Sequence, residues 1–383
     1  MNISPTHILF VLIIFQLLFL SIFLLTQEKR KRPGNILLGL FFLSICFNLL
    51  DVFLFQTGVY KSNPQMAGWG SCLPLLFGPF IYFYTQSVTS KNFTISYKSG
   101  LHFLPFLVLF AVTEFYYLRQ PRGVQEQFLS ALSQYHLPAS LSIVSTLIFV
   151  QFLSYVLASL RLVNRYKKAS GQYFSDTKNR DVTWLYAMLI FFIAIIIISA
   201  LNGLFAQTNL VKYYLLVFNF VILAMLVFIV RVLLKALRKP YFYPFSGEEG
   251  PRDKLPLSTK SKIHKTENSE AHQTEQILLQ YMASNKPFLA PELTLDQLAL
   301  QLSLRPRVLS QVINDRLGQN FYDFINRYRI QEASRLLTNP KDRKITILEV
   351  LYEVGFNSKS SFNTLFKKYT GLTPSEFKKK SLH

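Results

Sequence analysis

Seven long apolar runs before residue 240 constrain this chain more than any other feature. The first contains ILFVLIIFQLLFLSIFLL, which holds no charged residue. A helix needs about 20 mainly apolar residues to cross the hydrocarbon core of a bilayer, and few soluble helices are apolar all round. The sequence therefore predicts an all-α fold that starts with seven transmembrane helices, at residues 5–26, 35–57, 67–88, 100–118, 139–162, 183–206 and 213–235.

Basic residues are divided unequally between the loops that join these runs. The loops on one side hold the run Lys29–Arg32 and the cluster from Arg161 to Arg180, while those on the other side hold only Lys61, Arg119, Arg122 and Lys212. Lys and Arg collect in cytoplasmic loops. We therefore predict an N-terminus outside the cell and a C-terminal region in the cytoplasm. This topology accounts for much of the net charge of +20.

A few polar side chains interrupt the apolar runs, and with the predicted topology they fall in the outer half of the membrane. They are Asn48, Asp51, Glu114, Asn202 and Asn219. One interpretation is a signal-binding cavity that opens to the outside, since ionisable groups inside a membrane usually have a function. The alternative is that these groups form hydrogen bonds between helices. The sequence leaves both interpretations open.

The composition changes after Lys239. Residues 240–271 are rich in Pro, Gly, Ser and charged side chains and offer little to bury, so we predict a flexible cytoplasmic linker there. The predicted domains are thus a membrane domain at 1–239, this linker, and a cytoplasmic domain at 272–383. Cys46 and Cys72 lie within apolar runs, and their positions suggest neither a disulfide framework nor a metal site.

The cytoplasmic domain contains an internal repeat. TLDQLALQLSLRPRVLSQVINDRLG (Thr294–Gly318) aligns with TILEVLYEVGFNSKSSFNTLFKKYTG (Thr346–Gly371). Both copies begin with a capping-box pair that starts a helix, and both end at a glycine. The apolar positions of both copies are spaced for two helices with a turn between them, at Ser303 in one copy and Gly355 in the other. We predict two helix-turn-helix units, joined by a long buried helix at residues 320–338.

The second helix of each unit keeps a polar face after its apolar residues are buried. The residue types on that face are those that contact base edges in the major groove of DNA, and nearby basic residues are suited to phosphate contacts. A solvated surface is the plain alternative for one such face, but two faces in register favour DNA. The predicted base-reading residues are Arg307, Ser310, Gln311, Asn314, Lys359, Ser360, Asn363 and Lys367; the predicted phosphate contacts are Arg327, Arg329, Lys368 and Lys378.

The stretches Leu295–Ala333 and Ile347–Phe377 resemble the paired helix-turn-helix domain of AraC/XylS-type bacterial transcription regulators. The most specific part is GFNSKSSFNTLFKKYTGLTPSEF, which is close to the signature of that family. The resemblance covers about residues 272–383. It implies a domain of seven helices, with the second helix of each unit in successive major-groove segments, and a bacterial source. The membrane helices make the whole chain similar to membrane-embedded AraC-type regulators.

Two positions depart from the family pattern. Leu351 stands where a small alanine is usual, as at Ala299 in the first copy, so the helix crossing in the second unit is expected to differ. Thr364 stands where arginine is frequent, so one DNA contact is expected to be missing.

We therefore expect a membrane-tethered, sequence-specific transcription regulator in the bacterial cytoplasmic membrane. Its expected partners are promoter DNA and the lipid bilayer; RNA polymerase, a small ligand, a membrane partner and a second copy of the chain are further candidates. In one alternative the membrane part is only an anchor, with control by a partner protein or by proteolytic release. In another it is a transporter-like domain with a regulatory appendage. The chain shows no HExxH, phosphate-binding glycine loop or kinase motif, so we predict no enzyme activity and no cofactor.

Overall fold

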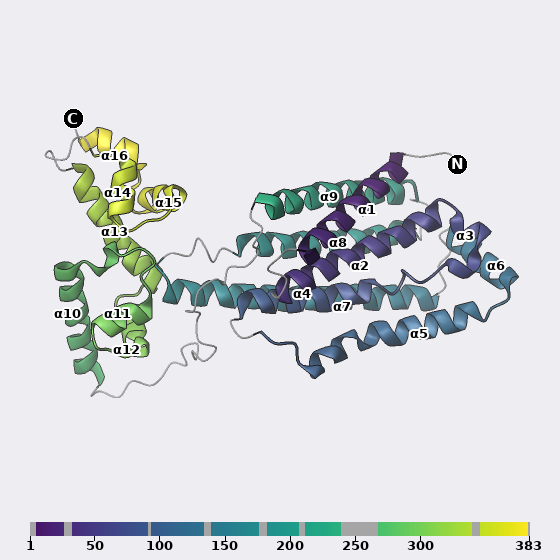
Figure 1. The fold of residues 1–383 in the computed structure, drawn as a ribbon, viewed down its shortest axis with the longest axis horizontal. Helices are drawn as coiled ribbons and strands as arrows, with labels where there is room; N and C mark the ends of the chain where they lie inside the picture. The colour runs from purple at the N-terminus through teal and green to yellow at the C-terminus, as the bar shows by residue number, and fades with distance from the viewer. Residues whose placement is uncertain are drawn as a thin grey trace. The chain divides into compact units, whose positions relative to one another are not determined.

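The computed structural model describes residues 5–26, 33–90, 93–133, 139–175, 182–206, 211–238, 267–338 and 345–381. The regular secondary structure of these residues is helical, apart from one isolated β-bridge between Phe174 and Thr294 (Figure 1). The contacts divide the chain into two compact units. The first comprises Met1–Asn164 and Val182–Ser246, and the second comprises Arg165–Asp181 and Gly247–His383.

The first unit is a bundle of long helices. These are α1 (Pro5–Thr26), α2 (Pro33–Gln56), α4 (Pro74–Thr89), α5 (Leu104–Leu118), α7 (Ala139–Tyr173), α8 (Thr183–Ala206) and α9 (Val211–Arg238). Helix α7 belongs to this unit up to Asn164. The shorter elements are α3 (Val59–Ser62), η1 (Pro64–Met66), η2 (Tyr97–Phe103) and α6 (Arg122–Ser133). Among the described residues, six stretches are long and apolar enough to cross a membrane, namely α1, α2, η2 with α5, α7, α8 and α9.

The third predicted run, residues 67–88, is where the structure differs from the sequence analysis. Its first part forms turns, and helix α4 starts only at Pro74, which occupies the first helical turn. The 16 residues of α4 span about 24 Å, which is shorter than the roughly 30 Å hydrocarbon core. Helix α4 packs against α2 within the bundle, with Gly78, Pro79 and Ile81 buried.

Large apolar side chains cover much of the outside of this bundle. None of the described residues of α5 is buried, and Leu107, Val112 and Phe115 are all more than half exposed. Helix α1 exposes Phe15 to a similar degree. A water-soluble protein rarely presents so large an apolar surface, whereas a lipid environment would solvate it.

The second unit contains the repeat. It is built from α10 (Glu267–Asn285), η4 (Pro287–Leu289), α11 (Leu295–Gln301), α12 (Pro306–Gln311), a π-helical turn (Val312–Arg316), α13 (Phe321–Thr338), α14 (Ile347–Glu353), α15 (Lys359–Thr370) and α16 (Pro374–Ser381). The described residues from Glu267 to Ser381 thus form seven α-helices, the number that the resemblance implies. Residues 240–266 of the predicted linker lie outside the described residues. Its last five residues, 267–271, are the start of helix α10.

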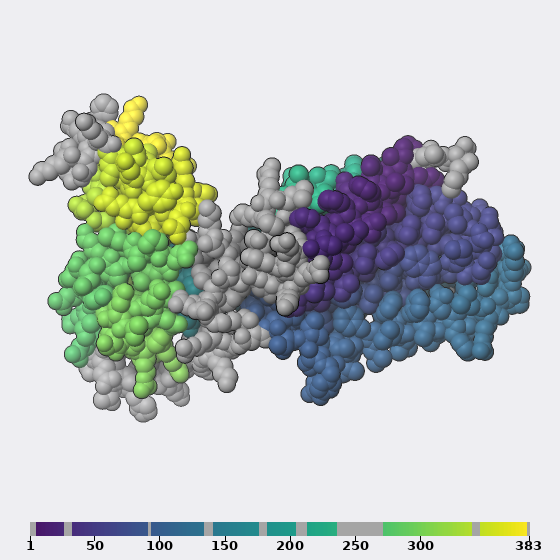
Figure 2. Space-filling model, viewed as in Figure 1, coloured from purple at the N-terminus to yellow at the C-terminus, as the bar shows by residue number. Residues whose placement is uncertain are grey.

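Two lobes make up this unit, as the green and yellow surfaces of Figure 2 show. Helices α10, α11 and α12 form one lobe, α14, α15 and α16 form the other, and α13 runs between them (Figure 1). Each lobe has its own apolar core. Helix α13 supplies Phe324 and Ile325 to the first core and Ile330 and Leu337 to the second. The predicted joining helix is therefore confirmed, including its burial on more than one side.

The local signals of both helix-turn-helix units are confirmed. Thr294 and Gln297 exchange the two hydrogen bonds of a capping box at the start of α11, and Thr346 and Glu349 do the same for α14. In the first turn Ser303 has a φ of +55°. Its counterpart Gly355 has a φ of +85°. Leu351 is buried in the second core, where Ala299 is buried in the first.

Candidate nucleic-acid interface

The first helix-turn-helix unit presents the polar side of α12 and of the π-helical turn that follows. Leu309, Val312 and Ile313 are buried and anchor this segment in the core. Arg307 and Gln311 are exposed on the opposite side. These two side chains have the donors and acceptors needed to contact guanine and adenine edges.

Ser310 and Asn314, also predicted to contact bases, are half-buried. The side-chain amide of Asn314 donates to the backbone oxygen of Ser310 at 2.8 Å and to its hydroxyl oxygen at 3.1 Å. The amide nitrogen is therefore engaged along its own helix. To contact a base through this nitrogen, Asn314 would have to exchange these hydrogen bonds for new ones.

Helix α15 of the second helix-turn-helix unit has the same division into a buried and an exposed side. Phe362, Leu365 and Phe366 are buried, with ring centroids of Phe362 and Phe366 5.5 Å apart. Lys359, Ser360 and Lys367 are exposed, Asn363 is half-buried, and the departing residue Thr364 is exposed among them. Ser358 is the N-cap of this helix, and its hydroxyl accepts a hydrogen bond from the backbone N–H of Ser361.

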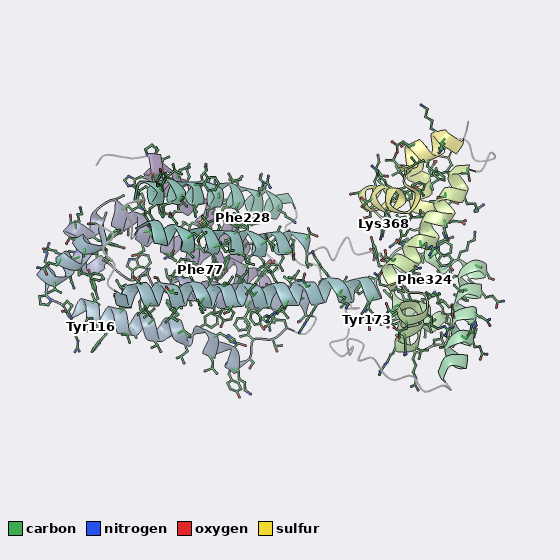
Figure 3. The ribbon with its side chains drawn as sticks, turned by 180° about the vertical axis from the view of Figure 1, so that it is seen from behind. Phe77, Tyr116, Tyr173, Phe228, Phe324 and Lys368 are labelled. Atoms are coloured by element: carbon green, nitrogen blue, oxygen red, sulfur yellow. The ribbon has the colours of Figure 1, made fainter. Side chains whose placement is uncertain are left out.

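A polar groove of about 720 Å³ lies along α13. Two of the predicted phosphate contacts, Arg327 and Lys368, line this groove together. Sequence reasoning did not identify Asp323, which lines it as well. Lys368 Nζ lies 2.9 Å from Asp323 Oδ1, and the hydroxyl of Tyr369 donates to the same oxygen at 3.0 Å. Figure 3 labels Lys368 on α15.

The pKa of Asp323 reflects these partners. Partial burial by itself would raise the pKa, but the hydrogen bonds from Lys368 and Tyr369 and the charge of Lys368 outweigh it. The pKa of Asp323 is therefore lowered from its ordinary value, and the carboxylate stays ionised at neutral pH. In the free protein the groove thus contains one acidic and two basic side chains.

The prediction that Arg329 contacts a DNA phosphate is wrong. This residue was expected at the DNA surface, but its side chain is completely buried. Its guanidinium donates to the backbone oxygens of Phe288 at 2.7 Å and Ala290 at 2.8 Å. It therefore holds the loop that contains η4 against α13 and cannot contact a phosphate. Arg329 is two residues after the exposed Arg327, and this spacing places it on the opposite, buried side of α13.

Lys378 is also engaged within the domain. It is half-buried, and its ammonium group donates to the backbone oxygen of Ile345. Lys379 and Lys380, the next two residues of α16, are exposed. Of the four predicted phosphate contacts, Arg327 and Lys368 are therefore the two that share an accessible groove.

The five polar residues predicted to line a signal-binding cavity lie in different parts of the helix bundle. Asn48 donates to the backbone oxygen of Gly70 at 3.0 Å, and Asp51 accepts a hydrogen bond of 2.7 Å from the hydroxyl of Tyr60. Gly70 lies so close to Asp51 that a Cβ on it would be 2.2 Å from the Asp51 Cβ. Glu114 lies beside the same turn, because a Cβ on Gly68 would be 3.7 Å from the Glu114 Oε1 atom. The structure therefore gathers Asn48, Asp51 and Glu114 near one turn.

The remaining two polar residues form contacts elsewhere. Asn202 donates to the backbone oxygen of Tyr214 at 3.2 Å, which joins α8 to α9. Asn219 accepts from the hydroxyl of Thr6 at 2.9 Å, which joins α9 to α1. Both are the interhelical hydrogen bonds of the alternative interpretation. The signal pocket stays a prediction, centred on the turn beside Asp51.

The comparison with protein families bears on the second unit. A family model described as a helix-turn-helix domain matches residues 298–380, which contain α12, α13, α14 and α15. The C-terminal region is an AraC-type helix-turn-helix domain. No solved structure matches the chain.

Curated relatives of this AraC-type domain are named as regulators. An uncharacterized transcriptional regulatory protein YesN of Bacillus subtilis is 34% identical over 80 residues, which is 21% of this chain and 21% of that protein. The Msm operon regulatory protein of Streptococcus mutans is 25% identical over 127 residues, covering 33% of this chain and 42% of that protein. An uncharacterized HTH-type transcriptional regulator in the cgkA 5′ region of Pseudoalteromonas carrageenovora is 27% identical over 132 residues, covering 32% of this chain and 76% of that protein. The matched part of the chain spans about a fifth of the length of the first of these relatives, YesN.

Proposed function

We propose that this chain is a membrane-bound, sequence-specific transcription regulator of bacteria. The observation that carries the proposal is the pair of exposed polar helix faces, one on α12 and one on α15, attached to the same rigid helix α13. A rigid connection fixes the distance between two reading helices, which lets one chain contact two successive major-groove segments. The names of the curated relatives support this assignment.

The first unit would hold this domain at the cytoplasmic membrane and sense a signal there. Its exposed apolar side chains and six helices of sufficient length support an integral membrane protein. The distribution of Lys and Arg supports an N-terminus outside and the AraC-type domain in the cytoplasm. The turn beside Asp51 would lie on the outer side, where Glu114 and Tyr60 add further polar groups.

DNA binding is tested with the full-length protein in nanodiscs, incubated with sheared DNA from its own genome. We expect recovery of a small set of promoter fragments, protected over two half-sites about one helical turn apart. Binding of all fragments with equal affinity would contradict sequence-specific regulation. Genome-wide occupancy in cells would then name the regulated genes, and these would indicate the signal.

The topology is tested separately with reporter fusions. Alkaline phosphatase is active only outside the cytoplasm, so fusions in the loop between α7 and α8 should be inactive and fusions after Lys61 should be active. The opposite pattern would contradict the proposed orientation. This test matters because α4 is shorter than an ordinary span and the orientation of the later helices depends on whether it crosses the membrane.

A membrane anchor without sensing is the second candidate, and the hydrogen bonds of Asn202 and Asn219 favour it. Replacing Asp51 with Asn distinguishes the two in a reporter strain. A sensor should respond differently to its inducing condition after this change. An unchanged response, with unchanged protein abundance, would support the anchor.

A further inference from the structure

A short segment that precedes α8 in the chain belongs to the fold of the AraC-type domain. Helix α7 ends at Tyr173, and residues Arg165–Asp181 fall within the second compact unit. The next residue, Phe174, forms the isolated antiparallel bridge with Thr294. Thr294 is the N-cap of α11, the first helix of the first helix-turn-helix unit.

Ser175 makes a set of buried polar contacts with that unit. Its backbone N–H and its hydroxyl both donate to the oxygen of Leu293, at 3.2 and 2.7 Å. The amide of Asn326 donates to the backbone oxygen of Ser175 at 2.9 Å, and Arg329 donates to its hydroxyl oxygen at 3.2 Å.

All three polar residues of this contact are inaccessible to solvent. Asn326 and Arg329 are 0% exposed and Ser175 is 1% exposed. Polar groups removed from water are costly unless they are hydrogen-bonded. Asn326 and Arg329, both on α13, therefore depend on Ser175 for part of their hydrogen bonding.

The apolar part of the segment completes the first core. Phe174 is 3% exposed and Tyr173 is 9% exposed. Both belong to the same cluster of buried side chains as Leu293, Leu295 and Phe324. Figure 3 labels Tyr173 at the end of α7 and Phe324 on α13. An aromatic side chain buried to this extent contributes substantially to the stability of the core it joins.

We infer that Tyr173–Ser175 is a docking segment, which occupies a fixed site on the first helix-turn-helix unit and links that unit to α7. The inference rests on the proposed function. A change at the membrane would reach DNA through this segment: displacing it removes Phe174 from the core, takes one hydrogen-bond partner from each of Asn326 and Arg329, and breaks the bridge to the N-cap residue of α11. The regulatory route thus runs through the loop between α7 and α8 instead of through residues 240–271.

Docking is tested with the full-length protein in nanodiscs by a disulfide between Phe174→Cys and Thr294→Cys. Directly opposed residues of an antiparallel bridge have Cα atoms about 4.5 to 5.5 Å apart, within the range of a disulfide. Cys46 and Cys72 are first replaced with serine, and a protease site is inserted after Pro251. After oxidation and cleavage, we expect the two fragments to remain joined on a non-reducing gel.

The matched control is the pair Phe174→Cys and Leu300→Cys. Leu300 lies on α11, the helix that Thr294 caps, but its side chain is 80% exposed. This pair should not join the fragments. A second variant retains the aromatic ring by placing photoreactive benzoylphenylalanine at position 174; illumination should join it to the fragment that contains α11 and α13. Failure of both variants, or equal joining in the control, would overturn the docking.

The coupling is tested by DNA affinity of the same full-length protein. We expect Phe174→Ala to weaken promoter binding by about tenfold or more, because removing a buried phenylalanine leaves a cavity in the core that supports α12. Ser175→Ala should weaken it less. The control Asn164→Ala, an exposed and uncharged position on α7, should leave the affinity unchanged.

The two proposals fail in different ways. Disulfide formation in a protein that binds no promoter would refute the proposed function and leave the docking intact. Promoter binding without disulfide or photochemical joining would refute the docking alone. Joining of the fragments together with an unchanged affinity of Phe174→Ala would refute the regulatory route.

Discussion

Lys368 of α15 lies 2.9 Å from the carboxylate of Asp323 on α13, and this ion pair links the second helix-turn-helix unit to the central helix. Both residues line the groove along α13 together with Arg327. A lysine that is expected to meet a DNA phosphate is thus already paired with an acid in the free protein. We therefore expect the balance of charge in the groove to set how strongly it attracts DNA.

Replacing Asp323 with Asn should strengthen binding to DNA of any sequence. The change frees Lys368 for a phosphate, so the dependence of log affinity on log salt should become steeper by about one. Filter binding over a salt series measures both quantities. Glu332→Gln is the control, because Glu332 also lies on α13 and pairs with Lys286 and Arg335 but does not line the groove. Equal effects of both changes would indicate a general charge effect.

The ion pair also predicts a dependence of stability on pH. The pKa of Asp323 is lower in the folded protein than its ordinary value of 3.8. Its contribution to stability is therefore complete above that value and is lost as the pH falls through the lowered pKa. Because Lys368 is exposed to solvent, the contribution is at most about 1 kcal/mol.

Hydrogen exchange of peptides from α13 and α15 would measure this effect. Both tryptophans, Trp69 and Trp184, lie in the first unit, so their fluorescence does not report on this domain. As the pH falls below about 4 and through the lowered pKa of Asp323, the wild-type protein should lose more protection than Asp323→Asn. The same loss in both proteins would contradict a lowered pKa of Asp323.

Gly355→Ala should destabilise the second helix-turn-helix unit strongly. A Cβ at this position would lie 2.6 Å from the backbone oxygen of Leu289, and the φ of +85° is unfavourable for alanine. The oxygen belongs to the backbone and cannot move aside easily, so we expect a cost of about 3 kcal/mol or more. Hydrogen exchange of α14 and α15 is the measurement.

Gly371→Ala is the matched control for this change. Gly371 has a φ of +79°, but nothing lies within 4 Å of the Cβ that alanine would add. Only the backbone cost of about 1 to 2 kcal/mol should remain. Similar losses at both glycines would show that the contact with Leu289 is unimportant.

Asn363→Ala and Gln311→Ala should each relax the preference for one base in one half-site. A bidentate contact between such an amide and adenine is worth about 1 to 3 kcal/mol of discrimination. Selection of bound sequences from a random pool would show the loss at one position for each variant. Lys368→Ala should instead weaken binding to all sequences alike, and a change in base preference there would contradict its assignment to phosphate.

Thr364→Arg should increase the affinity for DNA. Thr364 is exposed on α15 between the predicted reading residues, so a longer basic side chain can be accommodated there. A new contact of arginine with phosphate or guanine should raise the affinity about tenfold, which corresponds to about 1.4 kcal/mol. Thr364→Ala serves as the control and should bind as the wild type does. No gain from arginine would place this position outside the DNA surface.

The sequence by itself determined the features that depend on neighbouring residues. The capping pairs at Thr294 and Thr346, the positive φ at Gly355, and the buried and exposed sides of α15 all follow from spacings of a few residues along one helix. These interactions are local, so periodicity and residue type are sufficient to predict them. Six of the seven apolar runs were equally clear, because crossing a bilayer requires a long uninterrupted pattern.

Only the tertiary structure decided which distant residues meet. Arg329 follows Arg327 by two positions, yet it is buried while Arg327 lines a groove. Ser175 is 154 residues from Arg329 and still donates and accepts hydrogen bonds in the same core. The pairing of Asp323 with Lys368 spans 45 residues. Such contacts depend on how whole helices pack, and packing is set by the combined shape of many side chains, which no short sequence pattern specifies.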